Sequence, residues 1–144
     1  LVHEQVKGFP MEPRIAMLSY TNFGSSKGED PAKIQKAVKY LHKHHPNIVV
    51  DGEIQANFAL DSDLLEENFP FTTLAGEPAN TFIFPNLAAG NIAYKFVQTL
   101  GPSEAIGPIL MGFKKAVHIL QLGSTVREIV NMTAVAVVDA QRKG

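Results

Sequence analysis

Short apolar runs that alternate with longer amphipathic stretches most constrain what this 144-residue chain can fold into. The short runs are bounded by turn residues and are rich in apolar or β-branched side chains, which is typical of buried strands. They occupy residues 13–20, 47–51, 81–84, 106–111 and, more briefly, 116–120. Strands that alternate with helices predict βαβ units, hence an α/β fold with a largely parallel sheet between two helical layers.

Helices are expected over about residues 30–45, 58–65, 88–100 and 124–141. The first has an N-cap and a proline in its first turn, and Pro46 disfavours helical geometry in the residue before it. The last begins at Ser124 or Thr125, because Thr125 and Glu128 have the spacing of a capping box. Among the four predicted helices, the segment 58–65 has the weakest helical pattern.

Residues 1–12 mix glycine, proline and charge without a period, so we interpret them as a lead-in from an upstream chain. Residues 13–144 then form one domain, without repeats or low-complexity segments. The chain begins with Leu rather than Met, which favours a piece of a longer protein.

Composition excludes several classes of function. A net charge of −1 gives no general attraction to nucleic acid or to anionic lipid. The absence of cysteine excludes disulfides and thiolate metal sites and suits a reducing compartment. No apolar run reaches the roughly 18 residues that span a bilayer, and the N-terminus lacks a signal-peptide pattern. We therefore expect a cytoplasmic protein with no nucleic-acid or membrane partner.

One candidate site is the segment 85–95, PNLAAGNIAYK, which follows a strand and enters a helix. In an open α/β sheet, ligands gather at the carboxyl ends of strands, where helix N-termini present unpaired N–H groups to anions. Lys95 carries an ammonium that can neutralise a phosphate, or it is a solvated helix lysine. Asn86 and Asn91 either face the ligand or act as local caps.

A second candidate is the loop 21–29, whose Gly24, Ser25, Ser26, Lys27 and Gly28 can cradle a phosphate through backbone N–H groups. The loop lacks the order of a Walker motif, and many βα loops are rich in glycine and serine for turn reasons alone. The turn explanation therefore stays open beside the phosphate one.

The histidines give no metal or catalytic site. His42, His44 and His45 crowd a helix C-terminus, where the partial negative charge of the helix favours cations, and no carboxylate sits at a matching spacing. His118 stands in an apolar run, where a hydrogen-bonded, partly buried histidine is commoner than a catalytic one.

Residues 85–95 and 105–131 resemble the C-terminal end of the phosphate acetyl/butyryltransferases. The second stretch reads AIGPILMGFKKAVHILQLGSTVREIVN. The resemblance covers about residues 13–141. It implies the later portion of that family's two-lobed fold, which is similar to the isocitrate and isopropylmalate dehydrogenases. It also places Lys95 by the phosphates of CoA and the loop with Ser25, Ser26 and Lys27 at the cleft.

The resemblance departs from the family at its reactive residues. Where the family has a Ser-Arg pair before a glycine, this chain has Gln121 and Leu122 before Gly123. Leu122 cannot supply the positive charge that stabilises acetyl phosphate and a developing oxyanion. Glu128 occupies the place of an acidic residue that helps to deprotonate the CoA thiol, and equally that of a capping-box partner. The resemblance thus implies no catalytic residue here, and an acyl-CoA site formed by Lys95, Asn91, Asn86, Gln121, Leu122 and Glu128.

Residues 117–141 resemble still more the last segment of hybrid bacterial NADP-dependent malic enzymes. Such a parent oxidatively decarboxylates malate to pyruvate with NADP and a divalent metal, Mg or Mn. This segment would hold no cofactor itself, would respond to acetyl-CoA as effector and would help subunits to form a homo-oligomer beside the upstream catalytic domains. The alternatives are a divergent phosphate acetyl/butyryltransferase and a structural oligomerisation domain without a ligand.

Overall fold

A computed structural model describes residues 1–102 and 105–143. The chain divides into two compact units, Glu12–Phe96 and Leu1–Met11 with Val97–Gly144. In chain order the elements are α1 (Val2–Val6), β1 (Arg14–Leu18), α2 (Glu29–His44), β2 (Val49–Ile54), α3 (Ala56–Leu60), α4 (Ser62–Asn68), β3 (Thr81–Ile83), α5 (Leu87–Leu100) and α6 (Val126–Lys143). None of the described helices is both long and apolar enough to span a membrane.

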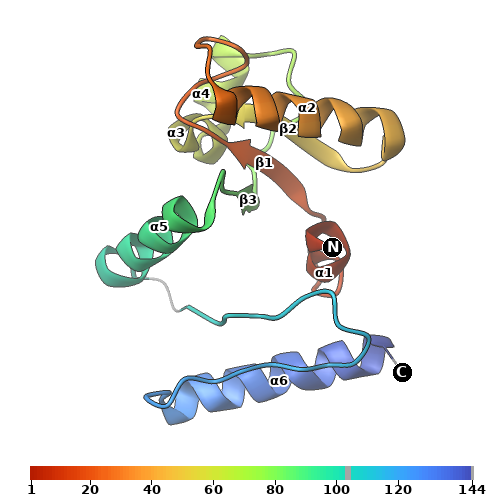
Figure 1. Ribbon diagram of the computed structural model, residues 1–144, viewed down its shortest axis with the longest axis vertical. Coiled ribbons are helices and arrows are strands. Elements are labelled where there is room, and N and C mark those ends of the chain that lie inside the picture. Colours follow the sequence, from red (N-terminus) through yellow and green to blue (C-terminus); the bar gives the residue numbers. More distant parts are fainter. Residues whose placement is uncertain (103–104, 144) are drawn as a thin grey trace. The chain divides into compact units, whose positions relative to one another are not determined.

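The unit Glu12–Phe96 is built on a three-stranded parallel sheet in the order β2-β1-β3 (Figure 1). Ile15 of β1 pairs with Val50 of β2 on one side and with Thr81 of β3 on the other. The three predicted strands of this unit are therefore confirmed, and so is the α/β class. β2 extends to Ile54, three residues beyond its predicted end.

Helices cover this sheet in separate layers. The long helix α2 lies against β2 and buries Ile34 and Val38, and Ile15 of β1 and Val50 of β2 are also buried. A second core cluster joins sheet residues to α3, α4 and the segment that follows them: Ala16, Leu18, Ile54, Ala59, Leu65, Leu74 and Ala79. Apolar residues that alternate along β1 are thus buried toward opposite sides, as the predicted three layers require.

The predicted helix over 58–65 is in fact two short helices. Asp61 ends α3 and caps α4, because its Oδ1 accepts a hydrogen bond from the Leu64 N–H at 3.0 Å. An aspartate in the middle of an apolar stretch competes with the helix for backbone donors, and here it starts a new helix.

Two predicted strands are wrong. Residues 106–111 and 116–120 are fully described and form no strand. A strand requires a hydrogen-bonded neighbour, and the described part of the unit containing them has no other strand. These runs therefore have no regular secondary structure, and Ile106 and Ile119 are exposed.

The apolar stripe predicted for residues 88–100 lies on a real helix, α5, but it is not buried. Its members Ile92, Phe96, Val97 and Leu100 are all exposed. α6, by contrast, buries Met132, Val135 and Asp139. The helix α1, within the segment predicted as an irregular lead-in, was not expected.

Candidate functional site

Two of the candidate segments lie at the carboxyl edge of the sheet. After β1 the chain passes through α2 to β2, and β3 then pairs on the opposite side of β1. The carboxyl ends of β1 and β3 therefore flank a topological switch point, the usual ligand position in an open α/β sheet. The two candidate segments, 21–29 and 85–95, begin at these ends.

A single buried carboxylate holds the start of the loop 21–29. Glu53 of β2 is fully buried, and its Oε1 accepts hydrogen bonds from the Thr21 hydroxyl at 3.2 Å and the Gly24 N–H at 2.6 Å. The Gln35 amide of α2 donates to the same oxygen at 3.2 Å. The Phe23 N–H donates to the Glu53 carbonyl at 2.8 Å. These four bonds fix the loop to β2 and α2.

The phosphate-loop candidates lie just beyond this anchor. Ser25, Ser26 and Lys27 are exposed. The Ser25 hydroxyl accepts a hydrogen bond from the buried Asn22 N–H at 3.0 Å, which ties the turn together as the turn explanation expects. Asn22 in turn accepts from the Gln55 N–H at 2.7 Å. The loop is thus rigid at its base and presents polar side chains to solvent.

The other candidate segment is joined to α2 by a residue that the sequence did not single out. The Lys33 ammonium donates to the Pro85 carbonyl at 3.3 Å and lies 3.4 Å from the Asp30 carboxylate. This contact links the start of α2, where the loop 21–29 ends, to the turn after β3. In the sequence, the signal that could have identified Lys33 was its place one turn into the helix predicted to follow the loop 21–29.

Within the segment 85–95, the local-cap interpretation of Asn86 is confirmed. Asn86 Oδ1 accepts a hydrogen bond from the Ala89 N–H at 2.9 Å at the start of α5. Asn91 is exposed, and the Lys95 ammonium lies over the Tyr94 ring at 4.9 Å from its centre. The phosphate contacts of these residues stay predictions.

The segment 121–128 belongs to the other unit, where Gln121 and Leu122 are exposed. The predicted capping box is confirmed: the Thr125 N–H donates to Glu128 Oε2 at 2.6 Å, and the Glu128 N–H donates to the Thr125 hydroxyl at 3.2 Å. The first of these bonds, helped by the Thr125 hydroxyl, lowers the pKa of Glu128 below its ordinary value.

His118 differs from its prediction. Its side chain is only 5% exposed, and neither ring nitrogen has a hydrogen-bond partner among the described residues. Nε2 lies 3.4 Å from Oδ2 of the buried Asp139, which also accepts from the Lys143 ammonium at 2.7 Å. The bond from Lys143 is the main reason that the pKa of Asp139 is lowered. His118 is thus buried beside the Asp139 carboxylate, without a hydrogen bond among the described residues.

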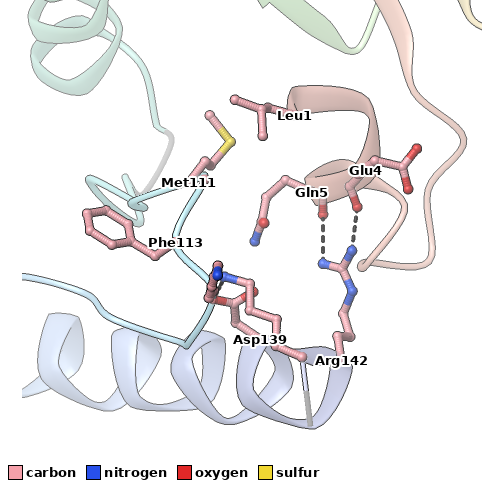
Figure 2. Close-up of a pocket in the computed structure, with 10 residues that line it drawn as sticks. Leu1, Glu4, Gln5, Met111, Phe113, Asp139 and Arg142 are labelled. Atoms are coloured by element: carbon pink, nitrogen blue, oxygen red, sulfur yellow. Dashed lines mark hydrogen bonds and ion pairs between the residues drawn. The ribbon is translucent and has the colours of Figure 1, made fainter.

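The unit formed by Leu1–Met11 and Val97–Gly144 also contains a cavity of about 310 Å³ (Figure 2). α1, the segment 111–114 and the end of α6 line it, and Arg142 donates there to the carbonyls of Glu4 and Gln5. None of the predicted site residues lies in its wall. No group of three or more potential metal ligands occurs among the residues that the structure describes.

Comparisons with known proteins agree with this architecture. The family model described as "Phosphate acetyl/butaryl transferase" matches residues 3–137. The chain is 43% identical over 132 residues to a phosphate acetyltransferase of Clostridium acetobutylicum, covering 92% of this chain and 39% of the relative. It is 39% identical over 140 residues to an NADP-dependent malic enzyme of Escherichia coli, covering 96% of this chain and 18% of the relative.

Solved structures give the same result. The EutD phosphotransacetylase from Staphylococcus aureus superposes with a TM-score of 0.88 at 35% identity, over 96% of this chain and 43% of that one. The chain thus spans about two fifths of the length of these two transferases, and about a fifth of the malic enzyme.

Proposed function

Because this chain belongs to the phosphate acetyl/butyryl transferase family, we propose that it is an acyl-CoA-binding regulatory domain of an NADP-dependent malic enzyme. Acetyl-CoA is the proposed effector. The chain spans only part of each relative, so malate oxidation, with its NADP and divalent metal, would belong to other segments of a longer cytoplasmic protein. Regulation requires acyl-CoA to bind two states of that protein with different affinity.

The observation that carries the proposal is the pair Gln121-Leu122 in the place of the family's Ser-Arg. An amide and a hydrocarbon replace an alcohol and a guanidinium, and both side chains stand exposed. Transfer of an acetyl group from phosphate to a thiol builds up negative charge, and losing the cation that stabilises it typically slows a reaction by orders of magnitude. The groups proposed to bind phosphate lie outside this pair, so binding without transfer is chemically consistent.

Self-association is the second part of the proposal. The exposed apolar side chains of α5 and α6, including Phe96, Leu100 and Val130, are of the kind that oligomer interfaces bury. We expect a dimer or a larger species, and light scattering that gives a monodisperse monomer at high micromolar concentration would contradict this part.

A phosphate acetyl/butyryltransferase is the second candidate. It is favoured by the sequence identity, which is 43% to the transferase of C. acetobutylicum and 39% to the malic enzyme of E. coli. The whole scaffold of β1 to α5 is compatible with either protein, so the chemistry at residues 121–122 has to decide between them.

Two measurements on the full-length protein test the proposal. Calorimetry should detect acetyl-CoA binding, and an assay of CoA-dependent phosphate release from acetyl phosphate should give no activity above a boiled control. Robust turnover that disappears in Glu128→Ala would instead establish the transferase. If no acetyl-CoA binding is detected, the remaining alternative is a structural oligomerisation domain without a ligand.

A further inference from the structure

Arg142, in the last turn of α6, holds the short helix α1 at its C-terminal end (Figure 2). Its Nη2 donates to the Glu4 carbonyl at 2.5 Å and its Nη1 to the Gln5 carbonyl at 3.4 Å. The last carbonyls of a helix have no partner within the helix and carry its partial negative charge. A guanidinium that bonds two of them is therefore a favourable cap, and here it comes from 137 positions further along the chain than Gln5.

Gly8 leaves the space that the guanidinium fills. A Cβ atom at position 8 would lie 1.9 Å from Arg142 Nη1 and 2.3 Å from its Cζ. Any larger residue at this position therefore has to displace the guanidinium. The Gly8 N–H donates to the Gln5 carbonyl at 3.1 Å, the same oxygen that Arg142 binds. We call Glu4, Gln5, Gly8 and Arg142 the α1 latch.

The helix α1 depends on this latch because it has little else to stabilise it. It is five residues long, and none of the five is buried. Isolated helices shorter than about 12–15 residues are marginal in water, and most helical stability in proteins comes from packing. The cavity of about 310 Å³ is enclosed by α1, the segment 111–114 and the end of α6. Segments with few buried contacts open at a low free-energy cost, so α1 has a docked and a released state.

α6 connects the latch to residues predicted to bind acyl-CoA. Gln121 and Leu122 precede this helix and Glu128 lies in its first turn, whereas Arg142 lies in its last turn. The helix has 18 residues and is therefore about 27 Å long. Both of its ends belong to the same compact unit. A rigid helix carries a displacement of its first turn to its last turn, which is one way in which two distant sites become coupled.

We propose that the α1 latch is the two-state element of regulation: acyl-CoA bound at the start of α6 shifts the equilibrium between docked and released α1. This inference rests on the proposed function and adds the element through which it acts. In that function the catalytic domains precede this chain, so α1 is the described helix nearest to them in sequence. Regulation requires an element whose equilibrium both sites bias. Arg142 and Gly8 are positioning residues in it, because neither belongs to the predicted acyl-CoA site.

Hydrogen exchange on the full-length protein tests the latch itself. Arg142→Ala and Gly8→Ala should each lower the protection factors of residues 1–9 about tenfold, the factor that corresponds to one charge-assisted hydrogen bond. Gly8→Ala keeps the arginine and only displaces its guanidinium. The double variant should therefore be no less protected than either single one, because both changes remove the same contact. Gln141→Ala is the matched control, since Gln141 is the exposed neighbour of Arg142 on α6.

Acetyl-CoA as the probe tests the regulatory role. In wild type it should change the protection of residues 1–9 and alter malate turnover, and couplings between two sites typically amount to about five- to 150-fold. In Arg142→Ala and Gly8→Ala both effects should be lost, although calorimetry still detects acetyl-CoA binding. Gln141→Ala should respond as wild type does.

The outcomes separate this inference from the proposed function. Unchanged protection in Arg142→Ala, or additive losses in the double variant, would show that the latch does not hold α1. If protection falls but acetyl-CoA still alters malate turnover as in wild type, the latch is not the regulatory element and the regulatory domain stands. If wild type binds no acetyl-CoA, the proposed function and the regulatory role of the latch both fail. Because the Arg142 contacts are exposed, an unchanged melting temperature is expected and shows that the variants are folded.

Discussion

Replacing Glu53 by alanine should destabilise the Glu12–Phe96 unit and release the loop 21–29. The carboxylate is fully buried and accepts three side-chain or backbone donors at one oxygen, from Thr21, Gly24 and Gln35. Hydrogen bonds to charged groups contribute about 1.5–3 kcal/mol each, and buried donors left unpaired cost about 1–3 kcal/mol. Removing the buried carboxylate also removes the cost of burying it, which offsets part of the loss in the free energy of unfolding. We therefore expect a net destabilisation of about 2–4 kcal/mol.

Glu53→Gln separates the hydrogen bonds from the charge. The amide oxygen can still accept from the three donors, but it is a weaker acceptor than a carboxylate. The amide NH₂ would also occupy the position of Oε2, which has no hydrogen-bond partner among the described residues. We expect this variant to lose about 1–2 kcal/mol, between wild type and Glu53→Ala.

Urea denaturation measures both effects, because a lower midpoint at an unchanged slope reports stability alone. Glu66→Ala is the matched control, since Glu66 is exposed on α4, and a surface change of this kind should stay within about 0.5 kcal/mol. If Glu53→Ala were as stable as Glu66→Ala, or if Gln and Ala at position 53 behaved alike, the anchoring role of this carboxylate would be refuted.

Three further variants test other parts of the structure. Thr125→Ala should lower the free energy of unfolding by about 0.5–2 kcal/mol in urea titrations, the usual loss for an N-cap, and an unchanged midpoint would contradict the capping box. The pKa of Asp139 is lower in the folded protein than in the unfolded chain. The contribution of Asp139 to folding stability is therefore complete above the unfolded value, near 3.9, and is lost as the pH falls through the folded value. Lys143→Met should therefore lose less stability than wild type between pH 7 and pH 3, and equal losses would argue against this ion pair. Lys95→Ala should weaken acetyl-CoA binding roughly ten- to a hundredfold in calorimetry without changing stability, whereas unchanged affinity would make Lys95 a solvated helix residue.

The sequence predicted most of the sheet but not where its second strand ends. Asp51-Gly52 has the composition of a turn, which places the end of the strand at Asp51. In the structure Asp51 is buried and accepts bonds from its neighbour Gly52 and from Thr72 and Thr73, two partners that no local pattern identifies. The strand therefore continues to Ile54, which places Glu53 at the base of the loop 21–29.

The runs 106–111 and 116–120 show the opposite error, because strands were predicted there and none forms. Their composition fits a strand, but pairing depends on a neighbour that a one-dimensional pattern cannot supply. The ring contact between Phe23 and Phe71 was missed for a similar reason, since the two residues are 48 positions apart along the chain and neither stands in a recognisable motif. By contrast, the capping box was predicted correctly because all of its contacts lie within four residues.

The capping box bears directly on the choice between binding and transfer. A general base must be placed to accept a proton from the reacting group, and Glu128 instead directs Oε2 to the Thr125 N–H. The same bond lowers the pKa of Glu128, which makes the carboxylate a weaker proton acceptor. Turning it toward a thiol would leave an N–H at the start of α6 without this partner. Under the proposed function, the leucine at position 122 and the engaged carboxylate at position 128 act in the same direction, because the first would leave out the charge that stabilises the transition state and the second would be a weaker base. The loop 21–29 and its anchor Glu53 depend on neither residue, so binding can persist where transfer does not.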